Sequence, residues 1–78
     1  MREQLKHALR LRYGLAPTEP TDAQLDAIIR LLQPFARPTE SQWLEAIYQV
    51  CSTAGTRAYA SQDHSDLAEM LDAIRRGR

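Results

Sequence analysis

The chain is poor in the residue types and patterns that mark several classes of protein. It has a single cysteine, so no disulfide can form within it, which is typical of a reducing compartment. It has no apolar run of the roughly 18 residues that a membrane-spanning helix requires, and no apolar segment near its start that would indicate a secretory signal. Its formal net charge is zero, which excludes a uniformly basic nucleic-acid binder. These features predict a cytoplasmic protein without a membrane segment.

The apolar residues that are present favour helices. Of the 78 residues, 44% are hydrophobic and 26% are charged, as in ordinary globular proteins. Ten leucines and eleven alanines stand against only five isoleucines and valines together, and this composition favours helices over strands. Nine of the ten basic residues are arginines, a bias that suggests a bacterial or mobile-element origin. We expect one small helical domain that spans residues 1–78.

Apolar residues at helical spacing predict four helices, at about residues 2–13, 22–33, 40–54 and 65–76. The first ends at Gly14, which suits a left-handed C-cap. The second and third begin with the same Thr-x-x-Gln capping box, at Thr21 and Thr39. Pro34 ends the second helix, and residues 55–64 follow no clear pattern. Short links between short helices predict an all-α fold, either a compact bundle or an orthogonal array.

The residues predicted to form the core recur at helical spacing on these segments. They are Leu5, Leu9, Leu25, Ile28, Ile29, Leu32, Trp43, Ile47, Val50, Cys51, Leu67, Leu71 and Ile74. Tyr13 also fits the apolar stripe of the first helix. Six residues are candidates for exposed contacts because they lie off a stripe or carry a polar end. These six are Leu11, Leu31, Leu44, Tyr13, Tyr48 and Tyr59.

Few residues could carry chemistry. Cys51 lies on the apolar stripe of the third predicted helix, where a cysteine is usually an inert core residue. The two histidines, His7 and His64, are far apart in the sequence. Residues 63–66 (Asp-His-Ser-Asp) include ligand-type side chains, but this composition is also that of an ordinary helix N-cap. The glycines are isolated and form no phosphate loop. We therefore expect a protein that is not an enzyme and binds no metal or cofactor.

Charge is distributed unevenly along the chain. Residues 1–14 carry a net charge of +3, residues 15–72 a net charge of −6, and residues 73–78 a net charge of +3. Three cations of the first helix, Arg2, Lys6 and Arg10, follow one another four residues apart. This spacing predicts a basic stripe, which we expect to lie opposite the leucine stripe. In an up-down bundle the two basic ends would meet in one patch.

Two functions remain open. The first is a small interaction module (an adaptor, an inhibitor or a regulatory subunit) that occupies the surface of a protein partner, or of a second copy in a homodimer, through its basic ends and acidic middle. The residues predicted to bind this partner are Arg2, Lys6, Arg10, Leu11, Arg12, Arg75, Arg76 and Arg78.

The alternative is a small DNA-binding regulator that grips phosphates with the first helix and the C-terminal arginines. A standard helix-turn-helix is not expected, because the link between Gln33 and Thr39 is longer than that motif allows. The helix after this link also carries Glu40 and Glu45, which would repel phosphates.

Overall fold

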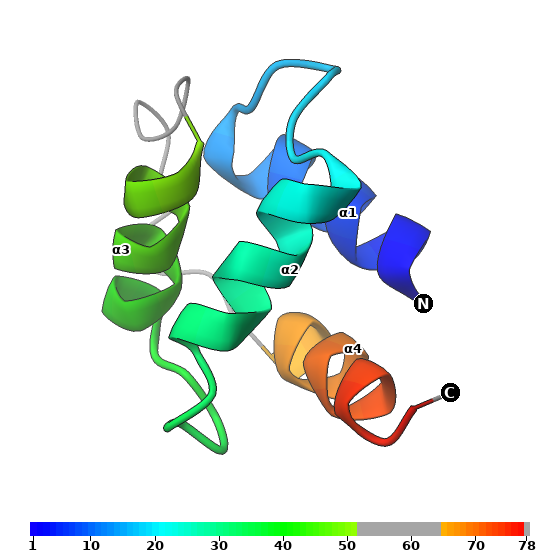
Figure 1. Ribbon diagram of the computed structural model, residues 1–78, viewed down its shortest axis with the longest axis vertical. Coiled ribbons are helices and arrows are strands. Elements are labelled where there is room, and N and C mark those ends of the chain that lie inside the picture. Colours follow the sequence, from blue (N-terminus) through cyan, green and yellow to red (C-terminus); the bar gives the residue numbers. More distant parts are fainter. Residues whose placement is uncertain (52–64, 78) are drawn as a thin grey trace.

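Four α-helices pack in two pairs (Figure 1). The computed structural model describes residues 1–51 and 65–77. The helices of these residues are α1 (Arg2–Tyr13), α2 (Asp22–Leu31), α3 (Glu40–Val50) and α4 (Ser65–Arg75). The principal contacts join α1 to α4 and α2 to α3, and the described residues contain no strand. The predicted all-α fold is confirmed. In this part of the chain no helix is long and apolar enough to span a membrane.

The helix ends lie close to the capping residues that the sequence provides. Gly14, directly after α1, has a φ of 64°, a left-handed conformation that glycine adopts at little cost. At the start of α2 the Thr21 hydroxyl accepts a hydrogen bond from the Gln24 N–H, and the Gln24 side chain accepts one from the Thr21 N–H. Thr39 and Gln42 repeat this capping box at the start of α3. Both predicted capping boxes are therefore confirmed.

Helix α2 ends at Leu31, two residues before the predicted end. Pro34 has no N–H with which to bond the carbonyl of Arg30, so a regular helical turn cannot include it. The Gln33 N–H donates to that carbonyl instead, at 3.1 Å, and this bond tightens the last turn.

Helix α3 ends at Val50, before the predicted end at residue 54. The Cys51 N–H still donates to the Ile47 carbonyl, but Cys51 itself is extended, with φ −102° and ψ 135°. The chain therefore leaves the helix while the Cys51 side chain stays buried. Residues 52–54 lie outside the described residues. Helix α4 ends at Arg75, one residue before the predicted end.

Side chains from all four helices form the core. Ten of the thirteen predicted core residues are buried, namely Leu5, Leu9, Leu25, Ile28, Leu32, Trp43, Ile47, Cys51, Leu67 and Leu71. The other three, Ile29, Val50 and Ile74, are only partly buried and pack against the edge of the core. Ile29 is turned about 100° around the helix from the buried Ile28. Val50 and Ile74 belong to the last turns of their helices, where fewer neighbours cover them.

Tyr13 was one of the candidates for an exposed aromatic residue, and that prediction is wrong. Its side chain is completely buried at the end of α1, and this burial raises the pKa of its hydroxyl to about 12. Leu15, which follows the Gly14 turn, is buried in the same core cluster. The apolar stripe of α1 therefore continues into the core as far as its last residue.

The other candidates for exposed contacts divide into three groups. Leu11, Leu31 and Tyr48 are exposed as predicted, and Leu11 most of all, at 66%. Leu44 is partly buried and packs against the core. Tyr59 lies outside the described residues. Leu11 therefore presents a large apolar side chain to solvent on the surface of α1.

The substitutions Leu9→Ala and Leu11→Ala should separate the two faces of α1. Leu9 is fully buried, so its truncation should lower the free energy of unfolding by about 2–5 kcal/mol. Leu11 is exposed, so the same change there should alter it by no more than about 0.5 kcal/mol. Urea unfolding followed by circular dichroism measures both values. Equal losses in the two variants would contradict the described orientation of α1.

Candidate partner-binding surface

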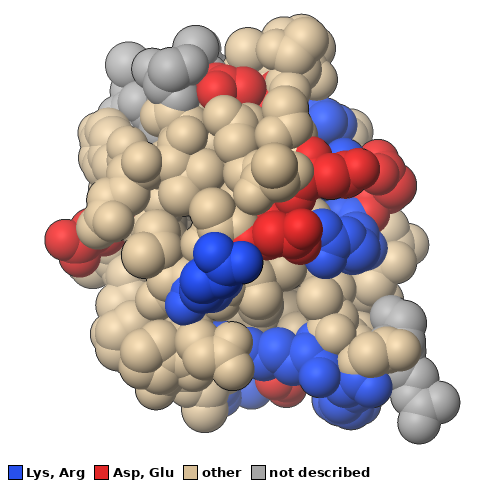
Figure 2. Space-filling model, viewed as in Figure 1, with Lys and Arg blue, Asp and Glu red and all other residues tan. Residues whose placement is uncertain are grey.

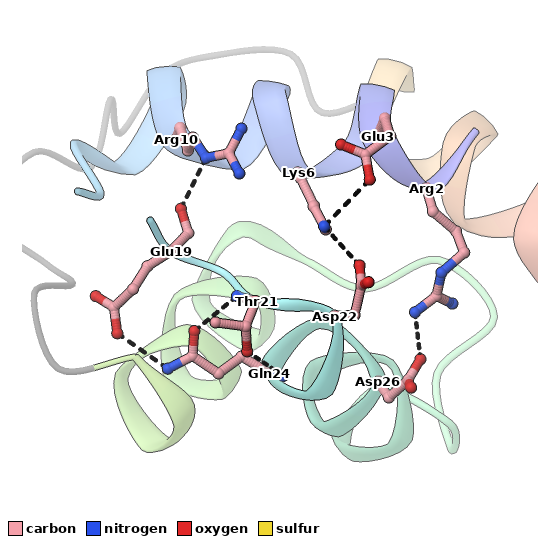
Figure 3. A network of polar contacts seen from close by, with 9 residues as sticks. All are labelled: Arg2, Glu3, Lys6, Arg10, Glu19, Thr21, Asp22, Gln24 and Asp26. Atoms are coloured by element: carbon pink, nitrogen blue, oxygen red, sulfur yellow. Dashed lines mark hydrogen bonds and ion pairs between the residues drawn. The ribbon is translucent and has the colours of Figure 1, made fainter. Parts of the chain in front are cut away.

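The cations of the basic stripe of α1, Arg2, Lys6 and Arg10, point towards α2 and the segment before it (Figure 3). At the centre of the stripe, Lys6 is 8% exposed because the methylene stem is covered. Its ammonium contacts two exposed carboxylates, one on α1 and one at the start of α2. Lys6 Nζ lies 3.1 Å from Glu3 Oε2 and also contacts Asp22 Oδ1. These two hydrogen bonds raise the pKa of Lys6, that from Asp22 having the larger effect.

The other two cations of the stripe also make contacts on this side: one contacts α2, and the other contacts the segment before it. Arg2 forms an ion pair with Asp26, and Arg10 Nε donates to the backbone carbonyl of Glu19 at 3.0 Å. Asp22 and Asp26 lie four residues apart on α2, as Arg2 and Lys6 do on α1, so the two helices match in antiparallel register. We call these contacts between α1 and the start of α2 the polar seam. Figure 2 shows such basic and acidic side chains side by side on one part of the surface.

The position of the stripe follows from helix geometry. Successive residues turn by about 100°, so Lys6 lies only about 60° around the helix from Leu9. The prediction that the stripe lies opposite the leucines was therefore wrong: the cations flank the apolar face and are carried into the contact with α2. The side of α1 opposite Lys6 is the one that carries Met1, Ala8 and Leu11.

The polar seam continues towards the end of α3 through Glu19 and Gln24. Glu19 is 9% exposed, and its carboxylate accepts a hydrogen bond from Gln24 Nε2 at 2.9 Å. The same amide nitrogen lies 3.4 Å from the carbonyl oxygen of Val50. The buried carboxylate of Glu19 therefore has a hydrogen-bond donor, as buried polar groups usually do. Through this donor, Gln24 joins the segment before α2, the start of α2 and the end of α3.

Arg12 holds the end of α1 against the start of α4. Its Nη2 lies 2.8 and 3.0 Å from the two carboxylate oxygens of Asp66, and its side chain is 13% exposed. An ion pair with one largely covered member fixes the angle of two helices better than a fully exposed one. Arg12, although predicted to bind a partner, is thus used inside the fold.

Arg75 caps the end of α2. Its guanidinium donates to the carbonyl of Leu32 at 2.6 Å and to that of Phe35 at 2.8 Å, with Ala36 at 3.4 Å. Carbonyls at a helix C-terminus lack helical partners and carry partial negative charge, so a guanidinium is a suitable donor for them. The neighbouring Arg76 is 70% exposed and only reaches Asp72, at 4.0 Å.

Both basic ends therefore meet α2, although they do not combine into a free basic patch. The cations of α1 contact its first half and Arg75 contacts its end. Arg78 lies outside the described residues. Of the cations predicted to bind a partner, Arg76 is the one whose side chain is mostly exposed within the described chain.

A groove lies between α1 and α4 on the described surface. It has a volume of about 820 Å³, and its apolar lining comes from Met1, Ala8, Leu11 and Met70. Met1 is 52% exposed and Leu11 is 66% exposed, and both line this groove. We call this the α1–α4 groove. A much smaller hollow, of about 90 Å³, includes Leu31 between α2 and α3.

Cys51 and His7, the described groups that could carry chemistry, lie in different settings, one in the core and one in the α1–α4 groove. Cys51 is 5% exposed, and burial, with a smaller effect of the Glu19 carboxylate, raises the pKa of its thiol to about 11. The thiol is therefore protonated at neutral pH. His7 lines the α1–α4 groove, and His64 lies outside the described residues. Among residues 1–51 and 65–77, no cluster of three or more His, Cys, Asp and Glu could hold a metal ion.

The substitution Asp22→Asn should destabilise the protein at neutral pH but not in acid. The hydrogen bond and the charge of Lys6 lower the pKa of Asp22 from its usual value of 3.8. A carboxyl with a lowered pKa in the folded state stabilises the fold above 3.8, and this stabilisation is lost as the pH falls through the folded value. Urea unfolding of the native protein and the variant, from pH 7 down to about pH 2, measures the difference.

The same substitution in a Lys6→Met background is the control for this prediction. Without the ammonium, Asp22→Asn should have a smaller effect at pH 7 and a weaker dependence on pH. If the native protein and the Asp22→Asn variant differed in stability by the same amount at every pH of this range, the ion pair would not be the cause.

The substitution Arg75→Gln should lower the free energy of unfolding by about 1–3 kcal/mol, because several carbonyls at the end of α2 lose a charged donor. Arg76→Gln removes the same charge from the next residue and should change stability by no more than about 0.5 kcal/mol. Thermal and urea unfolding compare the two variants. Equal stability of both variants would argue against the capping role of Arg75.

No family model matches this chain, and neither the curated proteins nor the solved structures include one with significant similarity to it, so the function is inferred from the geometry of its own residues.

Proposed function

We propose that this chain is a small, non-enzymatic helical module of the cytoplasm that binds a partner protein through the α1–α4 groove. It would act by occupying its partner's surface, as an adaptor, an inhibitor or a regulatory subunit does. The observation that supports this most directly is the exposure of Leu11, at 66%, beside a groove of about 820 Å³.

The groove has the features of a protein-binding site. Contiguous exposed apolar side chains are uncommon on monomers and are enriched where proteins bind one another. Met1 and Met70 add flexible, polarisable side chains, which adapt to the shape of a partner. The groove lies between two helices that Arg12 and Asp66 hold together, so its walls are positioned before a partner arrives.

This proposal moves the binding surface away from the basic ends. Lys6 and Arg10 are engaged in the polar seam, and Arg75 caps α2, so binding a partner with them would break contacts within the fold. Leu11 is the predicted partner-binding residue that keeps this role, together with groove residues of α4 that the sequence did not single out.

The DNA-binding alternative has weaker support from the same geometry. Its phosphate contacts were expected from Arg2, Lys6 and the C-terminal arginines, but Arg2 and Lys6 already have carboxylate partners on α2. Cations that are already paired gain less from phosphate contacts, because their own ion pairs must be given up. Exposed arginines remain at Arg30, Arg37 and Arg76, and this alternative would now depend on them.

The test compares capture of partners by the native protein and by Leu11→Gln. Gln keeps the helical propensity and adds no charge, so the fold should be retained while the apolar anchor is lost. We expect the partner captured from host lysate to bind the purified native protein directly, and to bind Leu11→Gln about tenfold more weakly. Titration calorimetry of the two purified proteins measures the affinities.

Leu31→Gln is the matched control, since Leu31 is 40% exposed but lies outside the α1–α4 groove. It should bind the partner as the native protein does. If Leu11→Gln bound as tightly as Leu31→Gln, the groove would not be the binding surface. If purified native protein bound only nucleic acid, the proposed function would be wrong.

A further inference from the structure

We propose that the occupant of the α1–α4 groove is a basic amphipathic helix of a partner protein, an inference that rests on the proposed function and specifies its ligand. The helix would place an apolar face on Leu11, Met1 and Met70. Its lysines or arginines would lie against the acidic rim of the groove.

The charge of the rim indicates the sign of the partner. Three carboxylates line the groove, those of Glu3, Asp66 and Glu69, against the single guanidinium of Arg12. Arg12 is already paired with Asp66, so Glu3 and Glu69 are the carboxylates of the rim that remain for a partner.

Neither of these two carboxylates is fully compensated. Glu3 shares the ammonium of Lys6 with Asp22, so one positive charge serves two negative ones. Glu69 is exposed and forms no ion pair within residues 1–51 and 65–77. Basic side chains of a partner would therefore meet available carboxylates without breaking an existing contact.

The length of α1 along the groove suits a helical partner. α1 has 12 residues, which makes it about 18 Å long at about 1.5 Å per residue. Its groove-facing residues Met1, Ala8 and Leu11 span almost this whole length. A partner helix of about three turns therefore matches the groove, and its residues at i, i+3, i+4 and i+7 would supply the apolar anchors.

A second copy of the same chain fits less well. In a symmetric dimer built on this groove, both copies use the same surface, so the acidic rim of one copy would face the acidic rim of the other. Like charges brought together at an interface oppose association. The acidic rim thus favours a basic partner over self-association.

The test uses two helical peptides of about 14 residues with the same leucine face, one with lysine and arginine on its polar face and one with glutamate and glutamine. Fluorescence anisotropy gives the affinity of each for the full chain. The basic peptide should bind at least about tenfold more tightly than the acidic one in about 50 mM salt, and this ratio should fall as salt is raised because exposed charges are screened.

The substitution Glu69→Lys tests the rim directly. It should weaken the basic peptide about fivefold and strengthen the acidic one, because it reverses one charge at the edge of the groove. Glu45→Lys is the matched control: it makes the same change at an exposed position of α3, and it should alter either affinity by less than about twofold.

The outcomes separate this inference from the proposed function. Equal binding of both peptides, abolished in both by Leu11→Gln, would overturn the basic partner and leave the groove as a protein-binding site. Tighter binding of the acidic peptide, or no binding of either at about 1 mM, would also overturn the inference. A dimer of the native chain in sedimentation experiments, if the substitution Leu11→Gln dissociated it, would overturn the inference as well. The capture experiment decides the proposed function independently of all these results.

Discussion

Both α1 and α4 make their main polar contacts with α2, and the arrangement of their charged side chains depends on these contacts. The first half of α2 offers Asp22 and Asp26 to the cations of α1, and its end offers free carbonyls to Arg75 of α4. Exposed ion pairs contribute at most about 1 kcal/mol each, so the buried apolar residues and not these pairs account for most of the stability. The polar contacts agree with the rotation of α1 that the burial of Leu5 and Leu9 requires, and Arg75 joins the end of α4 to the end of α2.

The rotation of α1 in turn determines which of its residues reach solvent. With Lys6 turned towards α2, the side about 180° away carries Met1, Ala8 and Leu11. That side faces outwards next to α4, where Met70 lies, and the α1–α4 groove results. The exposure of Leu11 agrees with the apolar face of α1, because Leu11 lies about 160° around the helix from the buried Leu9.

The helices and most of the core follow from local rules. Apolar periodicity and capping boxes act within a few residues, so they identify α1 to α4 and ten of the thirteen predicted core residues. The ends of α2 and α3 shift because Pro34 and the extended Cys51 act through backbone geometry that periodicity does not describe. Tyr13 was misjudged because a tyrosine with a polar end fits both the surface and the core.

The α1–α4 groove was harder to predict because it depends on pairs of helices. Within one helix, the spacing of Arg2 and Lys6 indicates a solvated stripe. The signal for the opposite interpretation lay on α2, where Asp22 and Asp26 repeat the same spacing with opposite charge. Glu69 and Met70 gave no signal of their own, since only the packing of α4 against α1 brings them beside Leu11.

The zero net charge of the chain thus has two different components. Paired charges, such as Lys6 with Asp22 and Arg12 with Asp66, orient the helices and leave little for a partner to bind. Charges left without full compensation within the described residues, such as Glu69 beside the groove, remain available at the surface. Because opposite charges attract and exposed leucine favours burial, the second component would select the proposed partner. A neutral protein can therefore discriminate by charge, provided that its internal pairs leave one sign beside an apolar surface.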